Sequence, residues 1–303
     1  MTDKPGEPAA LDLAAAPIVG IDELEFIADG IDHAEGICVT PDGVLYVSGE
    51  AGQIYRVADD GAATQIASTG GWTLGLAADA AGRIYACDPK SRRVWRLDPA
   101  DWNPVVFSDG PPGGTLTTPN WGAFGPAGTF YFSDSGGWKT RDGAILAVRP
   151  GGATEIWTRE SIDFPNGLAV SPDGREVWVL ESTPGRLVRF AIRADGTAGS
   201  REVLVELPGT VPDGIAFATD GSVIIACYRP DVVLRWRVDT GVEVLAGDPE
   251  GTALAAPTNC VFYGPDLATI AVPNLGRWHV TRFRVPGLAG VPLFYPTEAQ
   301  LRA

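Results

Sequence analysis

The sequence PNGLAVSPDGREVWVLESTPGRLVRF, residues 165–190, contains the pattern that decides the fold. It reads as a glycine-containing start, a short apolar run, a Pro-Asp-Gly turn, a second apolar and aromatic run, a loop and a third run. Valine and aromatic residues are enriched in strands, and glycine in such a turn accepts a positive φ. The stretch therefore predicts three consecutive antiparallel strands.

The same unit recurs along the 303 residues, six times in all. Its anchor positions are Gly36, Gly75, Gly122, Gly167, Gly214 and Cys260, with spacings of 39, 47, 45, 47 and 46 residues. A fourth strand-like run, such as TEIWT or VEVLAG, closes most units. Four antiparallel strands repeating every 40–50 residues or so are typical of a β-propeller blade. We therefore expect an all-β fold, a six-bladed β-propeller; a β-sandwich or two unrelated β domains would not explain six near-equal repeats.

The ends of the chain predict how the ring closes. In each unit the fourth strand directly precedes the next anchor, and LEFIAD, residues 24–29, stands before the first anchor. This segment is expected to complete the sixth blade and so to remove a free sheet edge. The run VPLFYP, residues 291–296, competes for that place or covers it. We expect a flexible N-terminal leader over residues 1–20 and a single propeller domain over residues 21–303.

Composition limits the partners and the compartment. With 23 Lys and Arg against 38 Asp and Glu, the net charge is −15, which disfavours nucleic acid and anionic membrane surfaces. No apolar run is long enough to span a bilayer, and the N-terminus does not read as a secretory signal. Cys38, Cys87, Cys227 and Cys260 lie in apolar strand-like runs outside any CxxC pair, as buried thiols in a reducing compartment do. We expect a cytoplasmic monomer or weak oligomer that binds a small molecule.

Propeller topology places the residue before each anchor at one end of the central channel. These residues are Glu35, Leu74, Trp121, Asn166, Asp213 and Asn259, with Asn120 one position earlier in the third blade. Each Asn or Asp before glycine is also an ordinary turn residue, but their common register in a ring favours an all-oxygen metal site. We expect one divalent cation, Ca²⁺ first, with Mg²⁺, Mn²⁺ or Zn²⁺ as alternatives. A typical zinc site is not expected, because no cysteine and no pair of histidines joins these residues.

Such a site supports one kind of chemistry best. A divalent cation polarises a carbonyl and activates a water, and a carboxylate such as Asp213 or Glu35 can take the proton of that water. Opening of a lactone or a related activated ester fits this arrangement. Neither a G-x-S-x-G elbow nor a phosphate-binding glycine loop occurs. His33, two residues before Glu35, is a candidate lining residue, whereas His279 is expected to be structural.

The phrases HAEGICVTPDG, PNGLAVSPDG and VPDGIAFATDG, with TNCVFYGPDLATIAV near the end, resemble the senescence-marker-protein/gluconolactonase/luciferin-regenerating-enzyme-like family, which includes regucalcin. The resemblance covers roughly residues 22–290 and implies a six-bladed propeller with one divalent metal ion and a lactonase or ester hydrolase activity. The family's Glu, Asn and Asp ligands fall on Glu35, Asn166 and Asp213. Its further Asn near metal and substrate matches Asn120, and its proposed general base falls on Asp213.

The sequence departs from the sugar lactonases of that family in the third blade. Those members resemble R-x-N-D-G, where Arg and Asp hold sugar hydroxyls, whereas this chain has Thr118 and Trp121 at these places. Trp72 and Trp138 are expected either near the pocket or in the packing between blades. The departure favours a less hydroxylated or aromatic lactone or ester. The candidate substrate-binding residues are Asn120, Trp121, Thr118, Asn259, His33, Tyr228 and Arg229.

Arg229 can bind a substrate carboxylate or be a solvated loop charge.

Three other functions are alternatives to lactone opening. The same pocket can serve a phosphotriesterase-like hydrolase. A non-enzymatic metal-binding propeller would act as a binding or regulatory module, and strictosidine-synthase-like carbon–carbon bond chemistry is disfavoured by the acidic metal residues.

Overall fold

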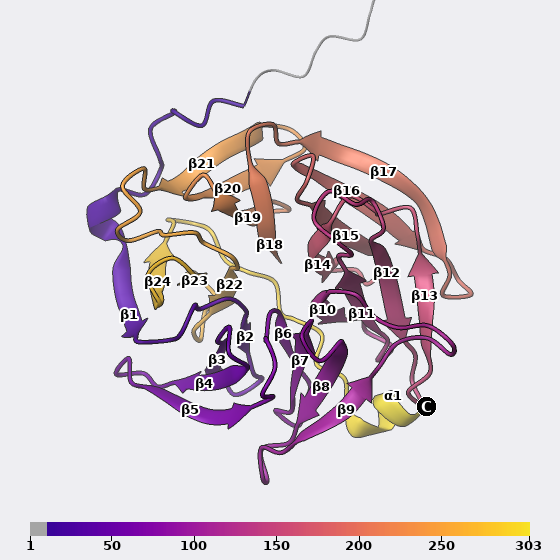
Figure 1. Cartoon of the computed structure of the whole chain (residues 1–303). Coiled ribbons are helices and arrows are strands. Elements are labelled where there is room, and N and C mark those ends of the chain that lie inside the picture. The colour runs from indigo at the N-terminus through magenta and orange to yellow at the C-terminus, as the bar shows by residue number, and fades with distance from the viewer. Residues whose placement is uncertain (1–10) are drawn as a thin grey trace, which may run out of the picture.

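The computed structural model describes residues 11–303 and has six four-stranded antiparallel sheets arranged around a central axis (Figure 1). The predicted six-bladed β-propeller is confirmed. Blade 1 contains β2 (Ile37–Val39), β3 (Leu45–Ser48), β4 (Gln53–Val57) and β5 (Ala63–Ser68); blade 2 contains β6 (Leu76–Ala78), β7 (Ile84–Asp88), β8 (Arg93–Leu97) and β9 (Pro104–Ser108). Blade 3 contains β10 (Pro119–Phe124), β11 (Phe130–Asp134), β12 (Ala144–Val148) and β13 (Thr154–Thr158).

The second half of the ring repeats this plan with longer strands. Blade 4 contains β14 (Pro165–Val170), β15 (Glu176–Glu181), β16 (Arg186–Ile192) and β17 (Ala198–Glu206). Blade 5 contains β18 (Val211–Phe217), β19 (Val223–Arg229), β20 (Val232–Arg237) and β21 (Gly241–Gly247). Blade 6 contains β22 (Val261–Tyr263), β23 (Thr269–Asn274), β24 (His279–Arg284) and, as its outermost strand, β1 (Glu25–Asp29).

The pairing of β1 with β24 closes the ring. Glu25 lies opposite Arg282 and Asp29 lies opposite His279 in this antiparallel pair. The prediction that LEFIAD completes the sixth blade is therefore confirmed. Just before β1, the amides of Ile18 and Val19 donate to carbonyls of β21, so this part of the predicted leader is packed against blade 5. Residues 1–10 of that leader lie outside the described residues.

The recurring glycines are explained by the close approach of neighbouring blades. A Cβ added at Gly36 would lie 2.2 Å from the carbonyl oxygen of Leu74 in the next blade. At Gly167 the added Cβ would lie 2.1 Å from the carbonyl oxygen of Asp213. Both distances are far below van der Waals contact, so only glycine allows the inner strands to pack this closely. The repeat of anchor glycines in the sequence is therefore a repeat of contacts between blades.

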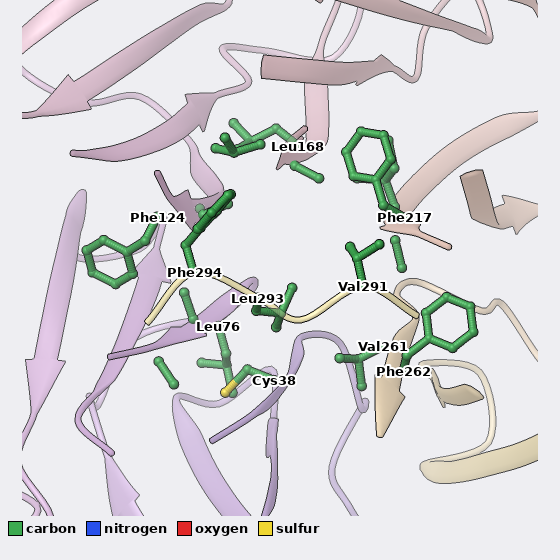
Figure 2. A pocket seen from close by; sticks show the side chains of 18 of the residues that line it. Cys38, Leu76, Phe124, Leu168, Phe217, Val261, Phe262, Val291, Leu293 and Phe294 are labelled. Atoms are coloured by element: carbon green, nitrogen blue, oxygen red, sulfur yellow. The ribbon is translucent and has the colours of Figure 1, made fainter. Parts of the chain in front are cut away.

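The C-terminal segment covers one end of the channel. Residues 291–295 and the ends of all six inner strands enclose an apolar cavity of about 100 Å³. The hydroxyl of Tyr295 donates to the carbonyl of Val39 at 2.8 Å and fixes this segment to blade 1. Figure 2 shows Val291, Leu293 and Phe294 of the segment among Cys38, Leu76, Phe124, Leu168, Phe217 and Phe262. The segment VPLFYP therefore does not take the place of LEFIAD in blade 6 and instead covers this end of the channel.

The chain ends in α1 (Glu298–Arg302), which lies against blades 2 and 3. Arg83 forms an ion pair with Glu298, and the Gln300 amide donates to the carbonyl of Pro126. Among residues 11–303 the structure contains no helix with the length and apolar character needed to cross a membrane.

Candidate metal centre

The uncovered end of the channel carries the ring of residues that the sequence singled out. The connections that lead into the inner strands and the loops between second and third strands both lie at this end. We call it the mouth and define it by Glu35, Asn120, Asn166, Asp213 and Asn259. Because the other end is closed by an apolar cavity and the C-terminal segment, a ligand reaches these residues from the mouth side.

One position of the expected ring needs a correction. The sequence placed Trp121 at the mouth of blade 3, but the register of β10 against β11 shifts between Pro119 and Trp121. The same shift follows Pro165 in β14 and Pro212 in β18, so Asn120 is the counterpart of Asn166 and Asp213. Its backbone carbonyl accepts from the Gly75 amide at 2.8 Å. Trp121 is buried with Tyr131 in the apolar core between blades 3 and 4. It also lines the apolar cavity at the closed end.

Serine hydroxyls orient two of the amides. Asn166 donates through Nδ2 to the Ser182 hydroxyl at 3.2 Å, and Ser182 donates to the carbonyl of Pro212 in the next blade at 2.7 Å. Asn120 repeats this arrangement through Ser135 at 3.0 Å and onward to blade 4. Since the amide nitrogens are engaged away from the axis, the carbonyl oxygens are left for the channel. Asn166 Oδ1 is buried and has no hydrogen-bond partner.

The two carboxylates of the ring repel each other. Glu35 Oε2 is buried and also lacks a hydrogen-bond partner. Burial raises the pKa of Glu35 well above its usual value, and the nearby charges of Asp213 and Glu50 raise it further. Burial likewise raises the pKa of Asp213, against which only the amide of Asn166 acts. No basic side chain contributes to either shift, so the negative charge at this point is uncompensated.

These residues fit a hard divalent cation. Two carboxylates and the free oxygen of Asn166 are the ligand types that Ca²⁺ and Mg²⁺ prefer. Within residues 11–303 no three His, Cys, Asp or Glu side chains gather around one point, so a cation held by Glu35 and Asp213 would also take the amide oxygen of Asn166. Asn259 is not oriented for this, because its Oδ1 accepts from the Cys260 amide at 2.6 Å and its Nδ2 is the buried group without a partner.

The other predicted site residues surround the mouth in different environments. His33 Nδ1 lies 2.7 Å from Asp32 and 3.2 Å from Glu50. Arg229 is exposed, pairs with Asp231 at 2.9 Å and stacks over the ring of its neighbour Tyr228. Thr118 is held by its backbone, which donates to Asp134. His279, expected to be structural, is buried on β24 with Nε2 3.0 Å from the carbonyl of Ala253.

Two contributions to the site were not predicted. The sequence pattern puts Ser135 and Ser182 in loops between second and third strands, which face the mouth. It does not predict that their hydroxyls accept hydrogen bonds from the amides of Asn120 and Asn166. Phe164 and Trp278 were not singled out at all, although both lie next to predicted residues: Phe164 precedes Asn166 by two positions, and the ring of Trp278 contacts His33. The repeat of a short polar residue after the second strand was the available signal for the serines.

Comparison with known proteins agrees with this architecture. Residues 33–273 match the family described as the SMP-30/Gluconolactonase/LRE-like region. The chain is 30% identical over 219 residues to a 6-deoxy-6-sulfogluconolactonase of Pseudomonas putida, with 62% of this chain and 69% of that protein covered. It is 31% identical over 139 residues to lactonase drp35 of Staphylococcus aureus, and this match spans only 43% of the length of either protein.

A solved structure extends the comparison to the whole fold. Regucalcin of Agrobacterium tumefaciens, described as a calcium-binding protein, matches with a TM-score of 0.71 and 19% identity, covering 89% of this chain and 97% of that one. At this identity the likeness establishes the shared propeller. The match of the family over residues 33–273 goes further. The chain therefore belongs to the SMP-30/gluconolactonase/LRE-like family.

Proposed function

We propose that this protein is a hydrolase that depends on a divalent cation and opens a lactone or a related activated ester. The observation that carries the proposal is the uncompensated pair Glu35 and Asp213 beside the free Asn166 oxygen at the open end of the channel. The names of the two similar proteins, a sulfogluconolactonase and a lactonase, support lactone opening as the reaction class.

Glu35, Asn166 and Asp213 would hold the cation, and Ca²⁺ is our first choice. Oxygen-only ligands favour it, and the description of the similar regucalcin as calcium-binding supports it. A cation bound there supplies a Lewis acid for the lactone carbonyl and lowers the pKa of a nearby water. The ion also offsets the repulsion between the two carboxylates, which the folded chain otherwise leaves unrelieved.

Asp213 has the proton-transfer role in this proposal. Its ionised carboxylate takes a proton from the water that attacks the lactone carbonyl carbon. When the carbon–oxygen bond of the ring breaks, the same group returns the proton to the departing alkoxide oxygen. The products are a hydroxy acid and a regenerated carboxylate. Asn166 lies beside Asp213 and opposes the rise of its pKa, which favours the ionised form.

The candidate substrate-binding residues differ in whether they can donate a hydrogen bond to the substrate or accept one from it. Asn120 has its amide nitrogen engaged by Ser135, so it presents an oxygen to a ligand hydroxyl or amine. Asn259 presents a free amide nitrogen and can donate to a substrate oxygen. Thr118, His33 and Tyr228 belong to segments at the same end of the channel, and we retain them as proposed contacts of the substituent. Arg229 is already paired with Asp231, so we retain it only for a ligand that displaces this contact.

A proton-release assay on a panel of lactones tests the function. The chelator-treated protein should be inactive, and Ca²⁺ should restore hydrolysis of at least one lactone. Asp213→Ala should abolish turnover while the far-ultraviolet spectrum stays that of the wild type. Undiminished turnover by folded Asp213→Ala would refute the role of this residue, and turnover that survives the chelator would refute the cation. Binding of Ca²⁺ without turnover of any lactone or ester would instead favour a binding module.

The compartment stays a proposal as well. Cys38, Cys87, Cys227 and Cys260 are all buried and unpaired, as predicted. Burial raises the pKa of these thiols, which keeps them protonated and unreactive. Free thiols without disulfides are what a reducing cytoplasm permits, so we propose that location.

A further inference from the structure

All three exposed tryptophans of this protein lie at the mouth. The sequence contains nine tryptophans, of which Trp72, Trp138 and Trp278 are exposed by 39%, 49% and 46%. Trp72 lies in the connection from β5 to β6, Trp138 between β11 and β12, and Trp278 between β23 and β24. Leaving such large apolar side chains in water is unfavourable, so their concentration at one end indicates a binding surface.

Two of these tryptophans form aromatic pairs with residues that lead into the metal centre. The ring of Trp278 lies 4.9 Å from that of His33, and the ring of Trp138 lies 5.0 Å from that of Phe164 in an edge-to-face arrangement. His33 precedes Glu35 by two residues, and Phe164 precedes Asn166 by two residues. Blades 1 and 4 are opposite each other in a ring of six, so the two pairs lie on opposite sides of the mouth.

The backbone at both pairs is held in an unusual conformation. His33 has φ of 44° and Phe164 has φ of 57°, in the left-handed region that non-glycine residues seldom adopt. Strain of this kind persists where the surrounding structure fixes a side chain for a purpose. Two equivalent positions in opposite blades share it, and both use it to place a ring against a tryptophan. The aromatic pairs are therefore a repeated feature of the mouth.

The charged side chains of Arg229 and His33 at the mouth already have partners. Arg229 is paired with Asp231 and covers the ring of Tyr228 at 4.8 Å. The imidazole of His33 lies between the carboxylates of Asp32 and Glu50. A ligand that approaches the metal centre thus meets flat aromatic surfaces rather than free charges at these points. Aromatic rings recognise other flat apolar groups by stacking or edge contacts.

We propose that the mouth selects lactones that carry an aromatic substituent. The lactone carbonyl reaches Glu35, Asn166 and Asp213, while the substituent packs on the Trp138–Phe164 pair or on the Trp278–His33 pair. This inference rests on the proposed function for the identity of the reacting group. The aromatic preference itself rests on the three tryptophans and the two ring pairs.

The kinetic test compares δ-cyclohexyl-δ-valerolactone with δ-phenyl-δ-valerolactone, which share the ring and a secondary leaving oxygen and differ in whether the substituent is aromatic. The wild type should have a kcat/KM about tenfold higher for the phenyl compound, the ratio expected from one well-placed aromatic contact. Trp138→Ala and Trp278→Ala are compared, and at least one should reduce this ratio about tenfold, mainly through KM, whereas the matching Phe variant should retain most of it. An unchanged ratio in both alanine variants, or a wild-type preference for glucono-δ-lactone, would overturn the inference.

Two controls separate stacking from other effects. Lys139→Asn changes the exposed neighbour of Trp138 and keeps a residue that tolerates the left-handed backbone, since Lys139 has φ of 62°. Trp102 lies in the turn between β8 and β9, at the end of the propeller away from the mouth, and its ring contacts that of Tyr46. Trp102→Phe is therefore a control for loss of a distant tryptophan. Both should keep the wild-type ratio. A loss in Lys139→Asn that equals the loss in Trp138→Ala would indicate recognition by charge and contradict the proposal.

A binding experiment distinguishes failure of this inference from failure of the proposed function. The δ-phenyl-δ-valerolactam has an amide in place of the ester and serves as a ligand for calorimetric titration of the Ca²⁺-treated protein. Its affinity should fall about tenfold in Trp138→Ala or Trp278→Ala. If no lactone is opened but this dependence is found, the function fails and the aromatic site stands. If lactones are opened but lactam affinity is the same in wild type and both alanine variants, the aromatic site fails and the function stands.

Discussion

Glu181 in blade 4 and Glu35 at the mouth both have buried carboxylate oxygens, but in opposite environments. The Glu181 side chain is fully buried and accepts hydrogen bonds from Ser161 at 2.7 Å, from Arg201 at 2.6 Å and from Arg186. Burial alone would raise the pKa of Glu181, but the hydrogen bonds of Arg201, Ser161 and Arg186 outweigh it and hold the pKa below its usual value. Glu35 has no such partners, and its pKa is raised.

The difference separates a buried carboxylate that stabilises the fold from one that is available to bind a ligand. The charge of Glu181 is compensated within the chain, so this residue stabilises the contact between β15, β16 and β17. No basic side chain compensates the charges of Glu35 and Asp213, and in the proposed function a divalent cation does so. Folding that leaves two acids unpaired at one point costs stability, which a bound cation restores. Four experiments test this comparison.

The largest effect is expected on catalysis. Glu35→Gln removes one carboxylate from the proposed cation site, and we expect kcat/KM for the best lactone to fall by roughly 10³-fold or more, because both cation binding and the charge at the site are lost. Glu202→Gln, on the exposed face of blade 4, should retain wild-type activity and is the matched control. Glu35→Gln with activity within a few-fold of the wild type would contradict the account.

The second effect concerns stability and has opposite signs in the two regions. Glu181→Gln should lower the free energy of unfolding by about 3 kcal/mol, because it leaves two arginines without their buried partner. Glu35→Gln should instead raise it by about 1 kcal/mol in the presence of chelator, because it removes repulsion. Urea denaturation measures both values. A loss of stability of similar size in both variants would remove the distinction between the two carboxylates.

The third effect is the pH dependence of that difference. An acid with a raised pKa in the folded state binds more protons folded than unfolded, so its contribution falls as pH rises above the unfolded value of about 4. Without cation, wild type and Glu35→Gln should therefore have similar Tm values near about pH 4, and wild type should have the lower Tm near about pH 8. Glu181 has a lowered pKa in the folded protein. It therefore stabilises the fold at pH values above its pKa in the unfolded chain and loses this stabilisation as the pH falls. Excess Ca²⁺ should raise the Tm of the wild type near about pH 8 to at least that of Glu35→Gln. A wild-type Tm that stays lower in Ca²⁺ would count against the cation site.

The smallest effect is expected at the serine that orients Asn166. Ser182→Ala frees the amide of Asn166, and the affinity for Ca²⁺ should fall by about tenfold, as for other groups that orient metal ligands. Ser48→Ala is the control, since Ser48 makes the same kind of bond between blades, to Leu74, without contacting a ring amide. Calorimetric titration measures both. Equal affinities of Ser182→Ala and wild type would show that Asn166 needs no such positioning.

The sequence predicted the propeller and its closure because both depend on local patterns that repeat. Anchor glycines, Pro-Asp-Gly turns and strand-like runs recur in register, and LEFIAD precedes the first anchor as the rule requires. Trp121 was placed at the mouth because Gly122 was taken as the anchor of blade 3. The Pro-Asn pair at residues 119–120 instead corresponds to the Pro-Asn and Pro-Asp pairs at 165–166 and 212–213, and β10, β14 and β18 all have a register shift after that proline. The positions of Glu35, Asn166 and Asp213 follow from the repeat, but the serine bonds that turn the amides depend on neighbouring blades.

The aromatic pairs could not be predicted for a similar reason. His33 and Trp278 are distant in the sequence and meet only because β1 closes blade 6 beside blade 1. Phe164 and Trp138 meet across the boundary of blades 3 and 4. In both cases the left-handed backbone that places the first ring is not indicated by a glycine or asparagine.

The proposed function depends on the binding of one divalent cation by Glu35, Asn166 and Asp213. Calorimetric titration of the chelator-treated protein with Ca²⁺ tests it most directly, with Glu181→Gln and the double variant Glu35→Gln/Asp213→Asn measured alongside. We predict one bound ion per chain in the wild type and in Glu181→Gln, and none in the double variant. Absence of Ca²⁺ binding by the wild type, or unchanged binding by the double variant, would contradict this proposal.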